Sequence, residues 1–145
     1  MADVNYEALK LENQLCFPLY ACAREVVKKY KPFLDDIDLT YTQYVTMMVL
    51  WEKPTVTSKE IGERLHLDSG TLTPVIKKLA EKGLVTRARS AEDERNLVVT
   101  LTDAGLALRD RAACIPGQMG QCVHLDPEDA KALHRILYKL LGELN

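Results

Sequence analysis

The sequence predicts a mainly α-helical protein with a small β-hairpin wing, that is, a winged helix-turn-helix inside an α-helical dimerisation domain. Within residues 57–101, two helical patterns are separated by only two residues, which favours a steep helix-turn-helix crossing. After Gly83 the apolar period shortens from that of a helix to that of a strand. The segment from Lys77 to Arg89 has a local charge of +4 in a chain of net charge −2, which indicates a polyanionic partner.

The first expected helix extends from Leu9 to about Lys31 and carries an apolar seam that suits packing on another helix. The seam residues are spaced alternately by four and three positions: Cys16, Tyr20, Ala23, Val27 and Tyr30. Pro18 either begins this helix as its first residue or kinks it, and Pro32 is expected to end it.

Each of the next three helices begins at a residue whose side chain caps it. Thr40 precedes an almost wholly apolar helix over 41–51, which is therefore expected to be buried on every side. Thr57 begins the first helix of the central pair in a capping-box pattern with Glu60. Asp68 caps the second helix of the pair.

Two short strands are expected at 84–89 and 96–101, joined by a polar turn that holds Arg95 at its tip. In a winged unit bound to DNA, the second helix enters the major groove and an arginine of the wing enters the minor groove. The residues expected to contact DNA are Ser69, Thr71, Thr73 and Lys77 in the major groove, Arg87 and Arg89 at phosphates, and Asp93 with Arg95 at the minor groove.

Two more helices are expected after the wing, with a break between them. Thr102 caps a helix that ends near Ala113, and residues 115–120 are expected to interrupt it because they contain Pro and Gly. Asp126 caps a final helix with a strong leucine stripe.

The whole chain is interpreted as one domain with a dimerisation part and a DNA-binding lobe. Residues 8–52 and 102–145 would be dimerisation helices, and 53–101 the winged lobe. The terminal helices are too apolar for a small monomer, so they are expected to bury against a second copy. A symmetric dimer then presents two recognition helices about 34–36 Å apart, one turn of DNA.

Composition narrows the class of protein further. The chain has 145 residues, no apolar run long enough to span a membrane, and no signal-peptide pattern at its N-terminus. It is therefore expected to be cytoplasmic, and its four cysteines are expected to be reduced rather than a disulfide framework.

The segment from Asp93 to Gly105 matches the D-x-R…L-T-x-x-G signature of the MarR family of dimeric bacterial repressors, and the order of elements resembles that family as well. Three other segments resemble its OhrR branch, which senses organic hydroperoxides. They are Glu12–Phe17, Leu39–Tyr44 and Leu67–Pro74. The resemblance covers nearly the whole chain.

This resemblance implies that Cys16 is the peroxide-reactive thiol and that Tyr20, Tyr30 and Tyr41 surround it. Tyr20 lies four residues on and shares a helix face with Cys16. Tyr30 lies about 21 Å along a straight helix, too far to reach the sulfur of its own chain. A sulfur beside Tyr30 would then belong to a partner chain. Phenol O–H groups that donate to this sulfur favour the thiolate, which is the form that attacks peroxides.

In some members of the branch a second cysteine on the other subunit resolves the oxidised sensor, and other members form mixed disulfides with small thiols. Cys122, expected in the loop before the last helix, is the better resolving candidate here, and Cys114 the weaker. Cys22 is interpreted as structural because it lies too far around the helix from Cys16 for a disulfide. Pro18 departs from the branch pattern, and its effect on the sensor helix stays open.

The sequence thus predicts a homodimeric transcriptional repressor that releases a pseudo-palindromic DNA operator when organic hydroperoxides oxidise Cys16. The main alternative is a MarR-type repressor released by a small aromatic ligand without thiol chemistry. A thiol peroxidase and a protein-interaction module are further alternatives. No enzymatic residues and no cofactor are expected. No metal site is expected either, because Cys114, Cys122, His124 and His134 lack ligand spacing.

Overall fold

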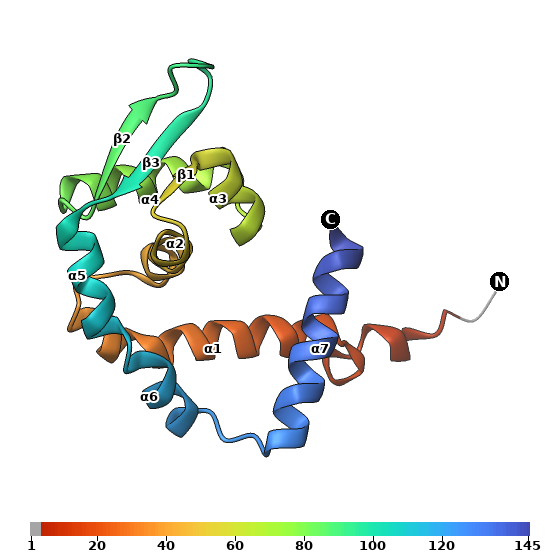
Figure 1. Ribbon diagram of the computed structural model, residues 1–145. Helices are drawn as coiled ribbons and strands as arrows, with labels where there is room; N and C mark the ends of the chain where they lie inside the picture. Colours follow the sequence, from red (N-terminus) through yellow and green to blue (C-terminus); the bar gives the residue numbers. More distant parts are fainter. Residues whose placement is uncertain (1–3) are drawn as a thin grey trace. The chain divides into compact units, whose positions relative to one another are not determined.

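The computed structural model describes residues 4–145, which form two compact units, one ending at Ile115 and the other comprising Pro116–Asn145 (Figure 1). The first unit contains helices α1 to α5 and a three-stranded sheet, and the second contains most of α6 and all of α7. The predicted class, mainly helical with a β-hairpin wing, is confirmed. No helix among the described residues is long and apolar enough to cross a membrane.

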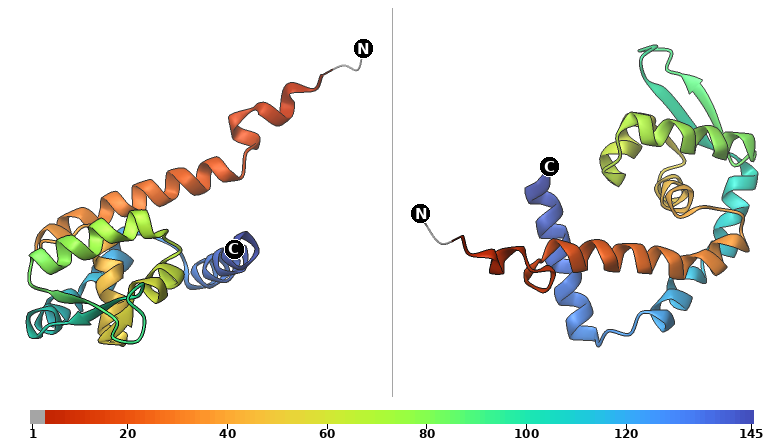
Figure 2. Two further views of the ribbon diagram at one scale, coloured as in Figure 1. Left: turned by 90° about the horizontal axis from the view of Figure 1, so that it is seen from above. Right: turned by 180° about the vertical axis from the view of Figure 1, so that it is seen from behind.

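The N-terminal helix begins later and ends later than expected. Two 3₁₀ turns, η1 (Tyr6–Leu9) and η2 (Leu11–Asn13), precede α1 (Cys16–Asp35), which is one continuous helix in Figure 2. The helix does begin near Pro18, as one of the two expectations had it, but Pro18 is the third residue of α1 and not the first. At the third position its missing N–H would have had no helical partner. The expectation that Pro32 ends the helix is wrong.

The helix passes Pro32 because the next turn is anchored in the core. Leu34 is 2% exposed, and Ile37 in the following loop is also buried. This burial offsets the one backbone hydrogen bond that Pro32 removes.

Helix α2 (Tyr41–Glu52) forms the centre of the first unit, as its apolar sequence predicted. Thr40 and Gln43 make a complete capping box, with Gln43 N 3.3 Å from Thr40 Oγ1 and Thr40 N 3.0 Å from Gln43 Oε1. Met47 and Leu50 have no exposed surface. The buried helix supports the winged lobe on one side and α1 and α5 on the others (Figure 1).

The helix-turn-helix consists of α3 (Ser58–Leu65) and α4 (Ser69–Glu81), and both predicted caps are present. Thr57 Oγ1 accepts from Glu60 N at 3.1 Å, whereas the Glu60 carboxylate pairs with Lys53 Nζ at 3.0 Å, so only half of the predicted capping box is formed. The turn between the helices is tight because His66 takes the left-handed conformation, with φ of +54°.

The wing is the hairpin of β2 (Val85–Arg89) and β3 (Leu97–Leu101), which projects beyond α4 in Figure 1. A third strand, β1 (Thr55–Thr57), pairs antiparallel with the other edge of β3, so the strand order is β1-β3-β2. The sequence did not predict β1, because three residues are too few to establish a period of two.

Helix α5 (Asp103–Ala112) is capped by Thr102 as expected, and it packs so closely on the lobe that only glycine fits at position 105. A Cβ on Gly105 would collide with the Leu84 carbonyl oxygen and lie 2.7 Å from Leu101 Cδ1. The Gly105 carbonyl also accepts a hydrogen bond of 2.9 Å from Trp51 Nε1.

We predict that Gly105→Ala lowers the free energy of unfolding by about 1–3 kcal/mol, because the added methyl overpacks this junction. Gly142→Ala in α7 is the matched control, since its added Cβ would meet nothing within 4 Å. The control should be neutral or stabilise by up to about 1 kcal/mol. Chemical denaturation compares the two, and equal stability of Gly105→Ala and the parent would contradict the prediction.

The expectation that residues 115–120 form a non-helical break is wrong. They lie in helix α6 (Ile115–Cys122). Pro116 occupies the first turn, where a helix has no use for its N–H, so the segment can remain helical despite its glycines. Helix α7 (Pro127–Leu144) starts at the predicted Asp126 cap and leaves Leu133, Ile136 and Leu144 exposed.

Candidate nucleic-acid interface and thiol site

The residues predicted to contact the major groove lie on the solvent-exposed side of α4, the predicted recognition helix, which is called the reading helix below. Leu72, Ile76 and Leu79 are buried beneath the helix, whereas the four predicted major-groove residues are exposed. These four are Ser69, Thr71, Thr73 and Lys77. The helical period that buries one stripe therefore turns the other toward solvent.

Local hydrogen bonds fix the first turn of α4. Asp68 Oδ1 accepts from Thr71 N at 2.7 Å, and Asp68 Oδ2 accepts from Thr71 Oγ1 at 3.1 Å. These bonds from Thr71 lower the pKa of the Asp68 carboxyl below its ordinary value. Thr73 Oγ1 donates to the Ser69 carbonyl at 2.7 Å. Both threonine hydroxyls therefore donate their protons to acceptors of their own chain, so toward a ligand their oxygens can act only as acceptors.

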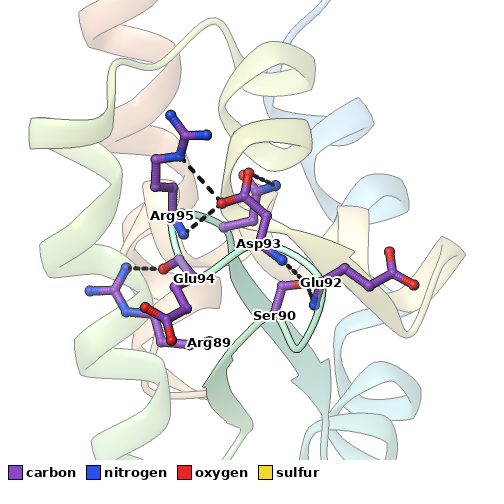
Figure 3. A network of polar contacts seen from close by, with 7 residues as sticks. Arg89, Ser90, Glu92, Asp93, Glu94 and Arg95 are labelled. Atoms are coloured by element: carbon purple, nitrogen blue, oxygen red, sulfur yellow. Dashed lines mark hydrogen bonds and ion pairs between the residues drawn. The ribbon is translucent and has the colours of Figure 1, made fainter.

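The wing tip is ordered by Asp93 (Figure 3). Asp93 Oδ1 accepts from Arg95 N at 3.0 Å and from Arg95 Nε at 3.3 Å, and Asn96 Nδ2 lies 3.5 Å from Asp93 Oδ2. The Arg95 side chain is nevertheless 92% exposed. The carboxylate thus orients an arginine that extends into solvent at the tip.

Two further arginines project from β2. Arg87 and Arg89 are two residues apart, hence on one face of the strand, and both are exposed. Arg89 Nη1 donates to the Glu94 carbonyl at 3.2 Å, which connects it to the tip loop (Figure 3). The outer face of α4, the two strand arginines and Arg95 are therefore all exposed on the same winged lobe.

Lys82, one of the five cations between Lys77 and Arg89, is not part of this exposed surface. Lys82 is directed away from this surface and contacts Asp38 in the loop between α1 and α2. Lys78 is exposed and lies 3.6 Å from the Glu81 carboxylate. The charge of the segment is consequently less concentrated on the interface than its sequence suggested.

The candidate sensor residues fall into two groups at opposite ends of α1. Cys16 is the first residue of the helix and is exposed, and Tyr20, one turn on, is 59% exposed. Tyr30 instead packs on Tyr41 of α2, with ring centroids 5.0 Å apart. Tyr30 is 14 residues beyond Cys16, which corresponds to about 21 Å along the helix, so one chain does not unite the two groups.

The sequence missed a third tyrosine beside this pair. The Tyr44 ring lies 5.8 Å from Tyr30 and 6.4 Å from Tyr41, and it is 1% exposed. Burial, with smaller contributions from Tyr30 and Tyr41, raises the pKa of Tyr44 to about 12. Burial likewise raises the pKa values of Tyr30 and Tyr41. All three phenols are therefore O–H donors at neutral pH.

We predict that Tyr44 makes the fold sensitive to alkali. The unfolded chain loses this proton near the ordinary value of 10.0, whereas the native state holds it to about pH 12. The contribution of Tyr44 to the free energy of unfolding is therefore fully present below about pH 10. It falls by up to about 3 kcal/mol as the pH rises from about 10 to about 12. Denaturation at several pH values measures the fall. Tyr44→Phe should reduce it and Tyr138→Phe, at an exposed position, should not; equal slopes in all three would contradict the assignment.

The remaining cysteines are exposed, and no disulfide joins any pair among the described residues. Cys122 is the last residue of α6, so the expectation that it lies in a loop is wrong. The segment stays helical because Pro116 lies in the first turn of α6, where its missing N–H is not needed. Cys114 lies between α5 and α6, where its Sγ is 3.5 Å from the Arg111 carbonyl oxygen. Within residues 4–145, no three His, Cys, Asp or Glu side chains are grouped to hold a metal ion.

Comparison with known proteins identifies relatives along nearly the whole chain. Residues 28–111 match the family model described as transcriptional regulator SarA/Rot. The organic hydroperoxide resistance transcriptional regulator of Bacillus subtilis (strain 168) is 49% identical over 140 residues, which cover 97% of this chain and 95% of that protein.

Solved structures of AbfR, a protein of Staphylococcus epidermidis, superpose well. Reduced AbfR bound to DNA has a TM-score of 0.79 at 34% identity, covering 96% of both chains. Disulfide-formed AbfR has a TM-score of 0.63 at the same identity, covering 95% of this chain and 94% of that one.

Proposed function

Since the chain belongs to the OhrR-type branch of the MarR family of transcriptional regulators, we propose that it is a homodimeric repressor that organic hydroperoxides release from its operator. The observation that carries this proposal is the near-full-length similarity to a regulator of organic hydroperoxide resistance, in a chain that exposes Cys16 at the start of α1. Cys16 is the redox-sensing residue in this proposal.

The dimer accounts for the two separated groups of sensor residues. Helix α1 exposes Phe17, Leu19 and Val27, and α7 exposes Leu133 and Ile136, which a second copy would cover. An antiparallel approach of two α1 helices then sets Cys16 and Tyr20 of one protomer beside Tyr30 and Tyr41 of the other. In this arrangement residues 8–52 and 102–145 are the dimerisation helices and 53–101 the DNA-binding lobe.

The sensing step is an oxygen transfer followed by a condensation. The Cys16 thiolate attacks the terminal oxygen of the hydroperoxide, the O–O bond breaks, and the alkoxide leaves and takes a proton from solvent as the alcohol. The Cys16 sulfenic acid then reacts with a second thiol to give a disulfide and water. Cys122 of the other protomer is the proposed resolving thiol; Cys114 and a small thiol are the alternatives that mass spectrometry of the oxidised protein separates.

DNA binding follows from the exposed lobe. The two α4 helices of the dimer enter successive major grooves of a pseudo-palindromic duplex, with Ser69, Thr71 and Thr73 at base edges. Lys77, Arg87 and Arg89 contact phosphates, which positions the lobe. A disulfide at the dimer seam changes the separation of the two helices, and a duplex of fixed half-site spacing is then released.

The proposal is tested by a gel shift with the operator-containing promoter. Reduced protein should retard the duplex, an organic hydroperoxide should abolish the shift, and dithiothreitol should restore it. Release by a small aromatic compound with all four thiols intact would instead favour the ligand-controlled alternative. Catalytic consumption of peroxide with a dithiol reductant would favour a peroxidase.

We predict that Lys77→Met weakens operator binding mainly at low salt. Each lost phosphate contact reduces the slope of log affinity against log salt by about 0.9, hence by about 1.8 in the dimer. Lys131→Met in α7 removes the same charge from a residue paired with Glu128 and should leave the slope unchanged. A slope for Lys77→Met equal to that of the parent would place Lys77 outside the interface.

A further inference from the structure

Lys82, the residue that caps the C-terminal end of α4, reaches back to the loop that ends α1. Its side chain is 28% exposed, and its Nζ donates to the Asp38 carbonyl. The same Nζ lies 3.3 Å from Asp38 Oδ2 and 3.3 Å from Gln43 Oε1. The ammonium group therefore makes two hydrogen bonds and one ion pair, all with oxygens of its own chain.

The loop that Lys82 contacts is anchored by buried side chains and by hydrogen bonds. Ile37 and Leu39 are buried, and Asp38 between them takes the left-handed conformation with φ of +52°. Gln43, the other acceptor, is buried and completes the capping box of α2. Arg111 near the end of α5 donates from Nη2 to the Asp36 carbonyl of the same loop. Lys82, which follows α4, and Arg111 of α5 thus each donate to a backbone carbonyl of the loop between α1 and α2.

This geometry is unlike that of a phosphate-binding lysine. A lysine that contacts DNA keeps its ammonium group exposed, as Lys77 does, whereas Lys82 directs its charge to oxygens of its own chain. Lys82 directly follows Glu81, the last residue of α4, so its contacts connect the C-terminal end of this helix to the loop after α1.

We infer that Lys82 is a positioning residue that fixes the orientation of the reading helix α4 to the C-terminal end of the sensor helix α1. This inference rests on the proposed function, since it specifies how a change at the α1 seam reaches the DNA-binding lobe. Without the ammonium group, α4 keeps its packing through Leu72, Ile76 and Leu79 but loses its direct link to the α1–α2 loop.

The test compares Lys82→Met, which keeps the apolar stem, with Lys78→Met, which removes the same charge from an exposed residue of the same helix. Operator affinity is measured for the reduced and the peroxide-treated protein at several salt concentrations. Lys82→Met should reduce the ratio of reduced to oxidised affinity by about fivefold or more and leave the salt slope unchanged. Lys78→Met should preserve the ratio, and Lys82→Arg, which restores a cation, should recover part of it.

Hydrogen exchange supplies a second readout that does not depend on peroxide. The amides of Asp38 and Leu39 donate to carbonyls of α1, and the amide of Thr40 donates to Gln43. Operator binding should slow exchange of these amides in the parent protein but not in Lys82→Met. If the parent itself keeps its operator after oxidation, the proposed function fails, and the exchange result alone decides the role of Lys82.

Two outcomes would overturn the inference. Equal exchange behaviour of the parent and Lys82→Met, or an unchanged affinity ratio in a parent that does respond to peroxide, would show that Lys82 transmits nothing. A salt slope reduced by about 0.9 for each protomer would make Lys82 a phosphate contact instead.

Discussion

Cys16→Ser is expected to bind the operator as tightly as the reduced parent and to remain bound after treatment with an organic hydroperoxide. A serine hydroxyl has no accessible higher oxidation state, so neither a sulfenic acid nor a disulfide can form at this position. The parent should lose about 100-fold or more in affinity under the same treatment, at the upper end of ordinary allosteric coupling. Gel shifts with and without dithiothreitol measure both proteins.

Cys22→Ser is the matched control for this experiment. Cys22 is exposed on the same helix, so general oxidation damage would affect both sites alike. The control should release DNA as the parent does. A Cys16→Ser protein that still leaves the operator after peroxide treatment would assign the trigger to another residue.

Arg95→Ala is expected to cause the largest loss of operator affinity among single substitutions in the wing. Asp93 holds the Arg95 guanidinium at the tip while leaving it 92% exposed, as a side chain poised for a minor groove requires. An arginine at base edges contributes about 1–3 kcal/mol, so loss from both protomers should weaken binding by about 100-fold or more.

Arg109→Ala removes the same charge from an exposed position of α5 and serves as the control. Titration of a labelled operator at one salt concentration compares both variants with the parent. Equal affinities for Arg95→Ala and Arg109→Ala would mean that the wing tip does not reach DNA.

The parts of the fold that the sequence predicted are those set by local chemistry. Thr40, Thr57, Asp68, Thr102 and Asp126 each begin a helix because their side chains accept backbone N–H groups of the first turn. Gly83 follows the C-cap of α4 with φ of +73°, a left-handed conformation that ends a helix and that glycine adopts without strain. The change from helical to strand period then located the wing.

The features that the sequence missed depend on distant partners. Strand β1 exists because β3 offers a free edge, and α1 continues past Pro32 because Leu34 is buried. Tyr44 joins Tyr30 and Tyr41 only once α1 and α2 pack together. Lys82 looked like part of a basic surface, and only the fold shows that its charge is directed to Asp38. Tertiary contacts of this kind leave no periodic signal in the chain.

The proposed sensor residues lie toward opposite ends of α1, so a single chain does not bring them together. Cys16 and Tyr20 occupy its first turns, and Tyr30 lies near its other end beside Tyr41. The spacing along α1, together with the identity of the residues, was sufficient to predict this separation from the sequence.

A crystal structure of the reduced dimer measures the decisive distance, from Cys16 Sγ to the phenol oxygens of the other protomer. We predict that Tyr30 Oη and Tyr41 Oη of the second protomer lie within about 3.5 Å of this sulfur, at hydrogen-bonding distance. A dimer in which Cys16 has no phenol oxygen of the other chain nearby would contradict a thiol switch at the subunit seam.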